Sequence, residues 1–337
     1  MFFANRKHFW GIDIGASSVK GVQLSRTRHG VQLQDAAIVE ISEDEGALSN
    51  GLSLLLGKSL AKARAAVHFS GRVSPEIRTL SLPSMPKKEM IEAVHWEARK
   101  SSSLSNEALV VDFLTMRERE IDGIRQHEVV IVVVDRAALA DQLQKINGCG
   151  LNVIAVDVAP MALLNTARLH FSEQLPDCLL YVDIGAKNME INIVNGGVLR
   201  FTRQVMMGGD AINLALSEAF GWSFSDAESR KRKEGILTEG SMREAVLEQV
   251  DRFIVEIQRS VDYYRAESRA HGIDKILLMG GMPLLPGFLE YFSRFFEAPI
   301  EIEDPFSMMR CEGPEVAMLR EIAPQFSLAT GLALRKG

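Results

Sequence analysis

A short motif occurs twice in this chain, about half a chain length apart. The first copy is Ile12-Asp13-Ile14-Gly15-Ala16, and the second is Val182-Asp183-Ile184-Gly185-Ala186. Each copy follows an apolar run and precedes a second run with β character, so each predicts a β-hairpin with a tight turn. One such hairpin in each half of the chain predicts two lobes of similar build that face one ligand.

The rest of the sequence alternates between patterns typical of strands and patterns typical of helices. Further β-runs are expected over residues 31–41, 65–69, 109–116, 128–134 and 276–279. Apolar residues at helical spacing predict helices over residues 48–63, 87–100, 136–147, most of 209–270, and 286–296. This alternation predicts an α/β protein with two related lobes. The helix–strand–strand–helix unit at 86–150 looks like an insertion between the first hairpin and the middle of the chain.

Composition and charge exclude several classes of protein. The net charge of −6 leaves no basic stripe for a nucleic acid, and the one dense basic run, residues 230–233, is expected to be a solvated helix face. The three cysteines show no CxxC spacing, which favours a reducing compartment without a disulfide framework. No apolar window approaches the roughly 18 residues that cross a bilayer, and residues 1–15 lack a signal peptide's apolar segment. We therefore expect a cytoplasmic protein with no direct membrane insertion, which reaches a membrane only through a partner.

The first hairpin offers groups that bind a phosphate tail. Because Gly15 has no Cβ, the backbone N–H groups of the turn can approach phosphate oxygens closely. The candidate phosphate-binding residues of this turn are Gly15, Ala16, Ser17, Ser18 and Lys20, which supply backbone N–H groups, hydroxyls and a positive charge. Phosphate would repel Asp13, so its expected role is to hold Mg²⁺ through water, and Asp183 has the same expected role in the second copy.

The second hairpin and two glycine pairs complete the candidate site. The second turn offers Gly185, Ala186, Lys187 and Asn188 in place of the hydroxyls of the first. Gly280 and Gly281, followed by Met282, come directly after a strand, where glycines leave room for a ring or a ribose. Gly208 and Gly209 could begin a helix whose N-terminus faces the same cleft. Taken alone, each pair could equally be a tight turn.

In this order, the two hairpins, the glycine pair and the segment GGMPLLPGF resemble the actin-like ATPase superfamily. More detailed similarity, over almost the whole chain, is to the PilM-like proteins of type IV pilus assembly. It is carried by LSLPSMPKKEMIEAVHWEARK and VIAVDVAP, which resemble the division protein FtsA as well, and by GGDAINLALSEAFGWSFSDAESRKRKEG and PIEIEDPF. The resemblance implies an α/β, two-lobed actin-like (ribonuclease H-like) fold that binds ATP or ADP with Mg²⁺.

The resemblance also implies four subdomains. The first-lobe core (1A-like) comprises residues 1–85, 151–175 and 322–337, with a 1C-type inserted subdomain at 86–150. The second-lobe core (2A-like) comprises residues 176–207 and 273–321, with a helical nucleotide-side subdomain (2B-like) at 208–272.

Three further site residues follow from the resemblance or depart from it. Glu228 and Lys231 are implied to contact the ribose and the purine, although their near-helical spacing could equally be an exposed ion pair on a helix face. PilM-like second hairpins usually carry Ser or Thr where this chain has Lys187. The Lys187 ammonium could supply a second phosphate cation, or it could occupy the phosphate position and weaken nucleotide binding.

Slow ATP hydrolysis is expected. Chaperone-like members of the superfamily carry an acidic residue just before the proline that opens the inter-lobe helix. Here Ala159 stands before Pro160, and Asp157 lies two residues earlier. Without a well-placed base, a factor of roughly 10²–10⁴ in rate is lost. The catalytic residues are therefore left unassigned.

The resemblance implies a cytoplasmic ATP-binding assembly platform of a type IV pilus machine, peripheral to the inner membrane through its partners. A groove between the first lobe and the insertion would bind the N-terminal cytoplasmic tail of a PilN-like inner-membrane protein, with other pilus inner-membrane components beside it. Nucleotide would close the lobes and alter that groove. Alternatives are an FtsA-like polymerising division protein, the cytoplasmic domain of a type II secretion platform, and a sugar or acetate kinase of the same superfamily.

Overall fold

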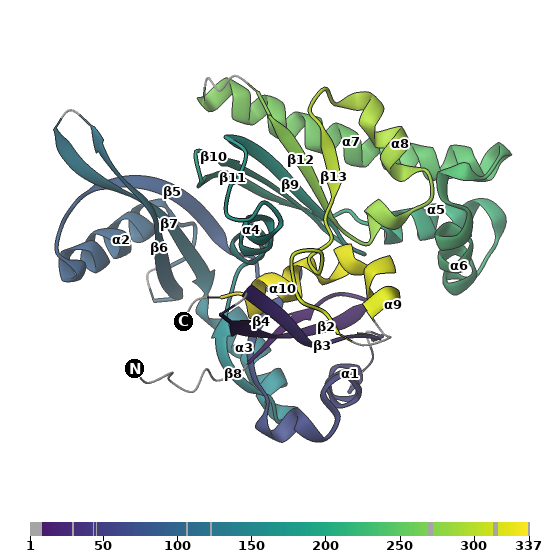
Figure 1. Ribbon diagram of the computed structural model, residues 1–337, viewed down its shortest axis with the longest axis horizontal. Helices are drawn as coiled ribbons and strands as arrows, with labels where there is room; N and C mark the ends of the chain where they lie inside the picture. Colours follow the sequence, from purple (N-terminus) through teal and green to yellow (C-terminus); the bar gives the residue numbers. More distant parts are fainter. Residues whose placement is uncertain are drawn as a thin grey trace.

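The computed structural model describes residues 9–28, 30–42, 44, 46–105, 107–121, 123–268, 272–312 and 316–335. These residues form two five-stranded sheets and one three-stranded sheet (Figure 1). Within them no helix is both long enough and apolar enough to cross a bilayer.

The first lobe is built on a five-stranded sheet with the order β3-β2-β1-β4-β8. Its strands are β1 (Trp10–Ile14), β2 (Ser18–Thr27), β3 (Gly30–Glu40), β4 (Arg64–Phe69) and β8 (Asn152–Val156). Strands β1 to β3 are antiparallel, whereas β4 and β8 run parallel to β1. Helices α1 (Ala47–Leu56) and α3 (Arg136–Gly148) pack against one face through a common apolar core.

The second lobe repeats this arrangement with the order β11-β10-β9-β12-β13. Its strands are β9 (Cys178–Ile184), β10 (Met189–Asn195), β11 (Val198–Val205), β12 (Lys275–Gly280) and β13 (Ile300–Ile302). Again the strands of the hairpin are antiparallel and the last two are parallel to β9. The two sheets place β1 and β9 at equivalent positions, so the prediction of two related lobes is confirmed.

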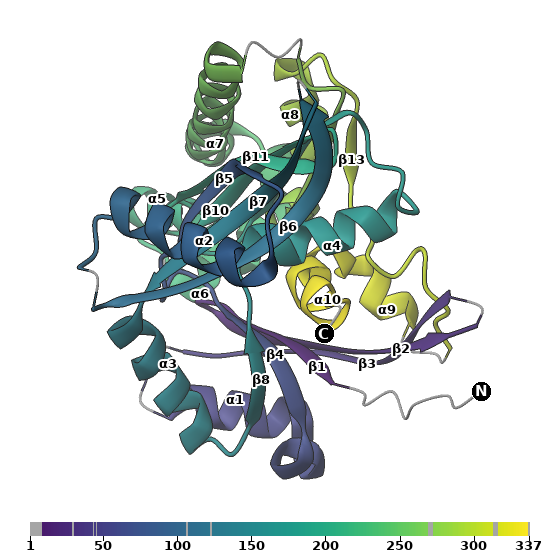
Figure 2. The same ribbon diagram turned by 90° about the vertical axis from the view of Figure 1, so that its left-hand side faces the viewer.

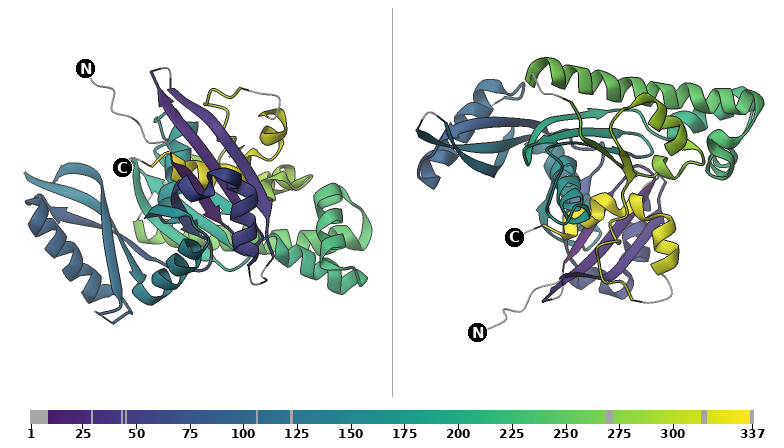
Figure 3. Two further views of the ribbon diagram at one scale, coloured as in Figure 1. Left: turned by 90° about the horizontal axis from the view of Figure 1, so that it is seen from below. Right: turned by 45° about the horizontal axis from the view of Figure 1, so that its top comes forward.

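Helices cover the outer face of the second-lobe sheet. They are α5 (Asp210–Phe220), α7 (Gly240–Ser268) and α8 (Phe288–Phe292), and α6 (Phe224–Glu234) packs on α5. The long α7 lies along that sheet (Figure 3), and the apolar stripe predicted from Val246 to Tyr264 is buried in its core. Short 3₁₀ segments complete the chain at Gly57–Lys62, Gly235–Leu237, Met282–Leu284, Ser293–Phe295 and Ala323–Phe326.

Two helices lie between the two large sheets (Figure 1). They are α4 (Ala159–His170) and α10 (Ser327–Ala333), which share an apolar core with residues of β9 and β12, and α9 (Val316–Glu321) precedes α10. The Thr166 hydroxyl donates to the Ser327 carbonyl at 2.7 Å, which ties the two helices together inside this core. The joint between the lobes is therefore a closely packed helix crossing.

The third sheet, which we call the insertion together with α2, has the order β5-β7-β6. Its elements are β5 (Glu76–Pro83), β6 (Leu109–Ile121), β7 (Ile124–Asp135) and α2 (Lys87–Ser101), which covers one face of the sheet (Figure 2).

The sequence predicted an insertion at residues 86–150, but in the structure the insertion begins before residue 86, with β5, and ends before α3. Strand β5 pairs with β7 along its whole length, so it belongs to the insertion sheet. At the other end, Leu139, Leu143 and Ile146 of α3 pack into the core of the first lobe. The sequence alone did not show either boundary. Prolines such as Pro83 interrupt the pattern between β5 and α2, and amphipathic spacing does not indicate which core a helix joins.

Candidate functional site

The first hairpin forms the tight turn that its glycine predicts. The Gly15 N–H donates to the Ser18 carbonyl at 3.0 Å. Ser17 is exposed at the tip, whereas Ser18 is buried at the start of β2, so Ser17 presents the accessible hydroxyl. Ala16, which precedes Ser17, is half-buried.

Asp13 sits at the base of this turn with two partners. Lys20 lies opposite it in the β1–β2 register, with Nζ 3.2 Å from Asp13 Oδ2. The Ser70 hydroxyl, which follows β4, donates to Asp13 Oδ1 at 3.1 Å. The sequence predicted that the Lys20 charge would bind a phosphate. In the structure this charge also forms an ion pair with Asp13. Sequence reasoning missed Ser70, because only the parallel pairing of β1 with β4 brings it to Asp13.

The second hairpin has the same turn and a helix docked on it. The Gly185 N–H donates to the Asn188 carbonyl at 3.0 Å. The N–H groups of Gly209 and Asp210, at the start of α5, donate to the Gly185 and Ala186 carbonyls at 2.9 and 2.8 Å. These bonds hold the start of α5 against the second turn, and they use the first N–H groups of the helix.

Gly208 is required by this close approach. A Cβ at Gly208 would lie 2.5 Å from the Ala186 carbonyl oxygen and 2.6 Å from that of Gly185. A Cβ at Gly209 would lie 3.3 Å from both Lys231 Nζ and Met282 Sδ. The structure thus brings together the second turn, this glycine pair, Lys231 and Met282.

Lys231 is buried, so the interpretation of an exposed ion pair on a helix face is wrong for this residue. Its ammonium forms an ion pair with Glu228 and donates to the Gly209 carbonyl at 3.1 Å. Glu228 also accepts from Asn213 Nδ2 at 2.7 Å. Burial raises the pKa of Glu228, but the charge and hydrogen bond of Lys231 outweigh it and hold that pKa below its usual range. This pair fixes α6 against the helix start at Gly209.

Asp183 differs from Asp13 in its surroundings. Burial and the negative charge of Asp13 raise the pKa of Asp183 to about 7, while the charge of Lys20 acts in the opposite direction. The residue opposite Asp183 in the β9–β10 register is Glu190, where the first hairpin has Lys20. The Asp13 and Asp183 carboxylates are close enough to repel each other, and of the two only Asp13 has a cation as its cross-strand partner.

Two carboxylates that sequence reasoning missed lie near Asp183. Burial raises the pKa of Glu190 to about 7 and that of Glu303, which follows β13, to about 8, and the negative charge of Asp183 adds to both shifts. Glu190 could have been found from its position, which matches that of Lys20 in the first hairpin. Nothing in the sequence near Glu303 indicates that it meets Asp183.

The facing pair Asp13 and Asp183 fits Mg²⁺ bound mainly through water. Carboxylate oxygens are the ligands that Mg²⁺ prefers, and a divalent cation between the two would offset their repulsion. Within the described residues there is no group of three or more His, Cys, Asp or Glu side chains able to hold a metal ion. Water and a substrate phosphate would therefore complete the coordination.

The remaining predicted residues border the same space. The Gly281 N–H donates to the Ile184 carbonyl at 3.1 Å, and a Cβ at Gly280 would lie 2.4 Å from Asp183 Oδ1. The glycine pair after β12 is thus packed against the second hairpin. Lys187 is exposed at the tip of that turn.

Both carboxylate oxygens of Asp157 have hydrogen-bond partners within the protein. Its Oδ2 accepts from Arg335 Nε at 3.1 Å, and its Oδ1 accepts from the Val158 N–H at 2.9 Å. Its carbonyl oxygen lies 2.9 Å from Nδ1 of His68. Ala159, buried at the start of α4, offers no side-chain acid or base before Pro160.

A groove of about 400 Å³ lies where the insertion meets the first lobe and α4. Its charged residues are Arg26, Asp112, Asp157, Arg168, Glu173 and Arg335, and its apolar lining includes Phe113, Leu114, Met116, Val132, Val158, Met161 and Leu334. Charges of both signs beside apolar side chains suit an amphipathic peptide.

Two matching lobes, two facing hairpin turns and a glycine pair behind them define the actin-like ATPase fold. The chain belongs to the family of the type IV pilus assembly protein PilM, whose family model matches residues 11–337. It is also similar to a chain of the PilM-PilN type IV pilus biogenesis complex, with 26% identity, a TM-score of 0.83 and 98% of each chain covered.

More distant similarities are to the division protein FtsA and to a structure with the same fold. Cell division protein FtsA of Escherichia coli (strain K12) is 29% identical over 116 residues, which are 34% of this chain and 27% of that protein. The chain therefore spans about a quarter of the length of this relative. MreB5 of Spiroplasma citri bound to ADP has the same fold, with a TM-score of 0.52, 13% identity and 97% and 95% of the two chains covered.

Proposed function

We propose that this protein is a nucleotide-binding assembly platform of a type IV pilus machine, which binds the N-terminal cytoplasmic tail of a PilN-like inner-membrane protein. The observation that carries the proposal is its similarity to the PilM-PilN complex over 98% of both chains. The groove between the insertion and the first lobe is the surface that suits such a tail. The protein would then be cytoplasmic and held at the inner membrane through this partner and other pilus components.

The tail-binding proposal predicts that Leu114→Asp weakens binding by about tenfold or more, because burying a leucine stabilises a complex by about 1.5–3 kcal/mol. Leu114 lines the groove and is 49% exposed, so the change leaves the core intact. Fluorescence anisotropy with a labelled tail peptide from the PilN-like protein of the same organism measures the affinity. Leu54→Asp is the matched control, since Leu54 is 74% exposed on α1, outside the groove. Absence of wild-type binding, with or without Mg·ATP, would overturn the proposal.

The nucleotide site is the second part of the proposal. ATP or ADP with Mg²⁺ would lie between the two hairpin turns, with its phosphates on backbone N–H groups of both turns and with the glycine pair before α5 beside them. Asp13 and Asp183 would hold the metal, while Glu228, Lys231 and Met282 would border the nucleoside. Hydrolysis would be slow, because Asp157 is bonded to Arg335 and Ala159 carries no acid or base.

We infer that Lys187 contributes a phosphate cation, because its side chain is exposed at the tip of the turn and does not fill the turn. Lys187→Met is therefore expected to weaken Mg·ATP binding roughly tenfold, the effect of losing one charge-assisted hydrogen bond. Isothermal titration calorimetry measures the affinity, and phosphate release in the same samples should stay below a few turnovers per minute. Lys233→Met, on the exposed part of α6, is the control and should bind like the wild type. Tighter binding by Lys187→Met would show instead that this lysine competes with the nucleotide.

A further inference from the structure

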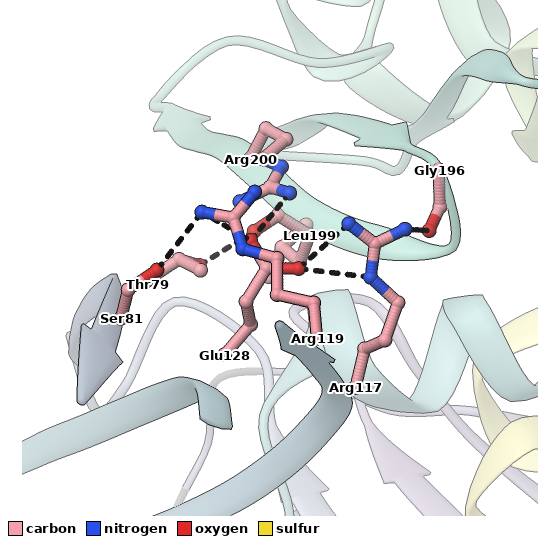
Figure 4. Close-up of polar contacts among 8 residues, drawn as sticks. All are labelled: Thr79, Ser81, Arg117, Arg119, Glu128, Gly196, Leu199 and Arg200. Carbon is pink, nitrogen blue, oxygen red and sulfur yellow. Dashed lines mark hydrogen bonds and ion pairs between the residues drawn. The ribbon is translucent and has the colours of Figure 1, made fainter. Parts of the chain in front are cut away.

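A buried carboxylate on the insertion is surrounded by three arginines from two parts of the molecule (Figure 4). Glu128 of β7 is 0% exposed. Arg117 of β6 reaches its Oε2 with Nε at 3.0 Å and Nη2 at 2.9 Å, and Arg119 lies 3.6 Å from Oε1. Arg200 of β11, in the second lobe, reaches Oε1 at 2.7 Å. We call these four residues the Glu128 cluster.

The Glu128 cluster joins the insertion to the second lobe. Besides the ion pair of Arg200, Arg117 Nη1 donates to the Gly196 carbonyl in the β10–β11 turn at 3.1 Å. The Thr79 hydroxyl of β5 donates to the Leu199 carbonyl of β11 at 2.5 Å. All three strands of the insertion therefore take part in one polar contact with the β10–β11 hairpin (Figure 4).

The Glu128 carboxylate is held ionised in this contact. Burial alone would raise the pKa of Glu128, but the hydrogen bond and charge of Arg200 and the charges of Arg117 and Arg119 outweigh it and lower the pKa. A buried ion pair is weak support for overall stability, because desolvation offsets much of the attraction, yet it strongly penalises an arrangement in which one partner is withdrawn. Such a contact favours one relative position of the two parts over others.

The cluster lies between the two proposed binding sites along the sheets. Residues 112–116 of β6 line the groove, and the same strand continues through a bulge between Thr115 and Arg117 into the cluster. On the other side, β11 pairs with β10, which pairs with β9, and β9 carries Asp183. Strands are stiff elements, so a movement of the β10–β11 hairpin would displace Arg200 and Gly196 relative to β6 and β7.

We propose that the Glu128 cluster is a latch that couples the nucleotide cleft to the tail-binding groove, closed as in this structure and opened when the lobes rotate. This inference rests on the proposed function, because it takes the groove and the cleft as binding sites. The latch crosses between the insertion and the second lobe, which a hinge movement of the lobes would displace relative to each other. It supplies the two-position element that coupling between distant sites requires.

Arg200→Met tests the latch. In the wild type we expect Mg·ATP to change the affinity for the tail peptide by about fivefold or more, the lower end of typical coupling between sites. In Arg200→Met this ratio should fall below about twofold, while the peptide and Mg·ATP each still bind alone. Fluorescence anisotropy with and without Mg·ATP gives the ratio, which a purely structural role of Arg200 would leave unchanged.

Arg203→Met is the matched control. Arg203 lies on the same strand, but it pairs with Glu256 of α7 within the second lobe, at 2.7 Å. This variant loses the same charge without touching the latch, so it should keep the wild-type ratio. Arg200→Lys, which keeps the charge and loses the planar fork, is the second variant if Arg200→Met does not fold, and it should give an intermediate ratio.

The outcomes separate the latch from the proposed function. If the peptide binds and Mg·ATP has no effect in the wild type, or if Arg200→Met keeps the full ratio, the latch is overturned and tail binding stands. If the peptide does not bind at all, the proposed function fails. The coupling through the Glu128 cluster is then tested by measuring hydrogen exchange of the β6 backbone amides with and without Mg·ATP. An exchange difference that Arg200→Met abolishes supports it, and the absence of any difference in the wild type overturns it.

Discussion

Gly331→Ala is expected to destabilise the protein by about 3 kcal/mol or more, at the upper end of what overpacking a core costs. A Cβ at Gly331 of α10 would lie 1.8 Å from the Ala162 carbonyl oxygen and 2.7 Å from the Thr166 hydroxyl oxygen of α4. The first of these is helix backbone, which cannot move without displacing α4 from the core that both lobes share. Because α10 also packs closely on β1, where a Cβ at Gly11 would lie 2.0 Å from the Ala329 carbonyl oxygen, it has no room to retreat.

Urea unfolding followed by circular dichroism measures this effect as a lower midpoint in Gly331→Ala. Gly148→Ala is the matched control, because Gly148 is the last residue of α3 and a Cβ there would meet nothing within 4 Å. Alanine also has the higher helix propensity, so the control should be neutral or slightly stabilised, by less than about 1 kcal/mol. Equal midpoints for the two variants would show that the crossing of α4 and α10 is looser than the structure indicates.

The sequence was sufficient for features that depend on neighbours along the chain. The doubled hairpin predicted two equivalent turns, and the Gly15 to Ser18 and Gly185 to Asn188 hydrogen bonds, both 3.0 Å, confirm them. The apolar periodicity of α7 predicted a buried stripe, and the resemblance carried by the motifs predicted the actin-like fold and the PilM family, which are confirmed as well. Each of these patterns is a local consequence of turn chemistry or helical spacing.

Features that depend on distant contacts could not be read in the same way. The spacing of Glu228 and Lys231 looks the same whether the pair lies in solvent or against the start of α5. Glu128 is a single acidic residue in a β-run, and only the packing of β11 on the insertion surrounds it with arginines. The nucleotide contacts, the subdomain roles and the tail contacts remain predictions, because the geometry of the turns and of the groove does not identify the molecules that bind there.

Glu303→Gln is expected to make the unliganded protein more stable than the wild type at pH 8, by on the order of 4 kcal/mol, with the difference vanishing near pH 4.5. Burial, with the negative charges of Asp183 and Asp304 beside it, raises the pKa of Glu303 from its ordinary value of 4.5 to about 8. Between these values the unfolded chain releases the proton and the folded chain keeps it, so stability falls as the pH rises. Glutamine cannot ionise, which removes this loss.

Thermal unfolding in EDTA from pH 4.5 to 8.5 measures the effect, since a divalent cation at Asp183 would change the charges around Glu303. Glu301→Gln is the control of opposite sign. Glu301 of β13 accepts from His170 at 3.0 Å and from Lys275 at 2.6 Å, and these hydrogen bonds lower its pKa. Its stabilising effect is present above pH 4.5 and is lost as the pH falls through the lowered value, so Glu301→Gln should be less stable than the wild type at neutral pH. If both variants shifted the melting temperature in the same direction at pH 8, the effect at Glu303 would reflect packing, because ionisation predicts opposite signs for these two carboxylates.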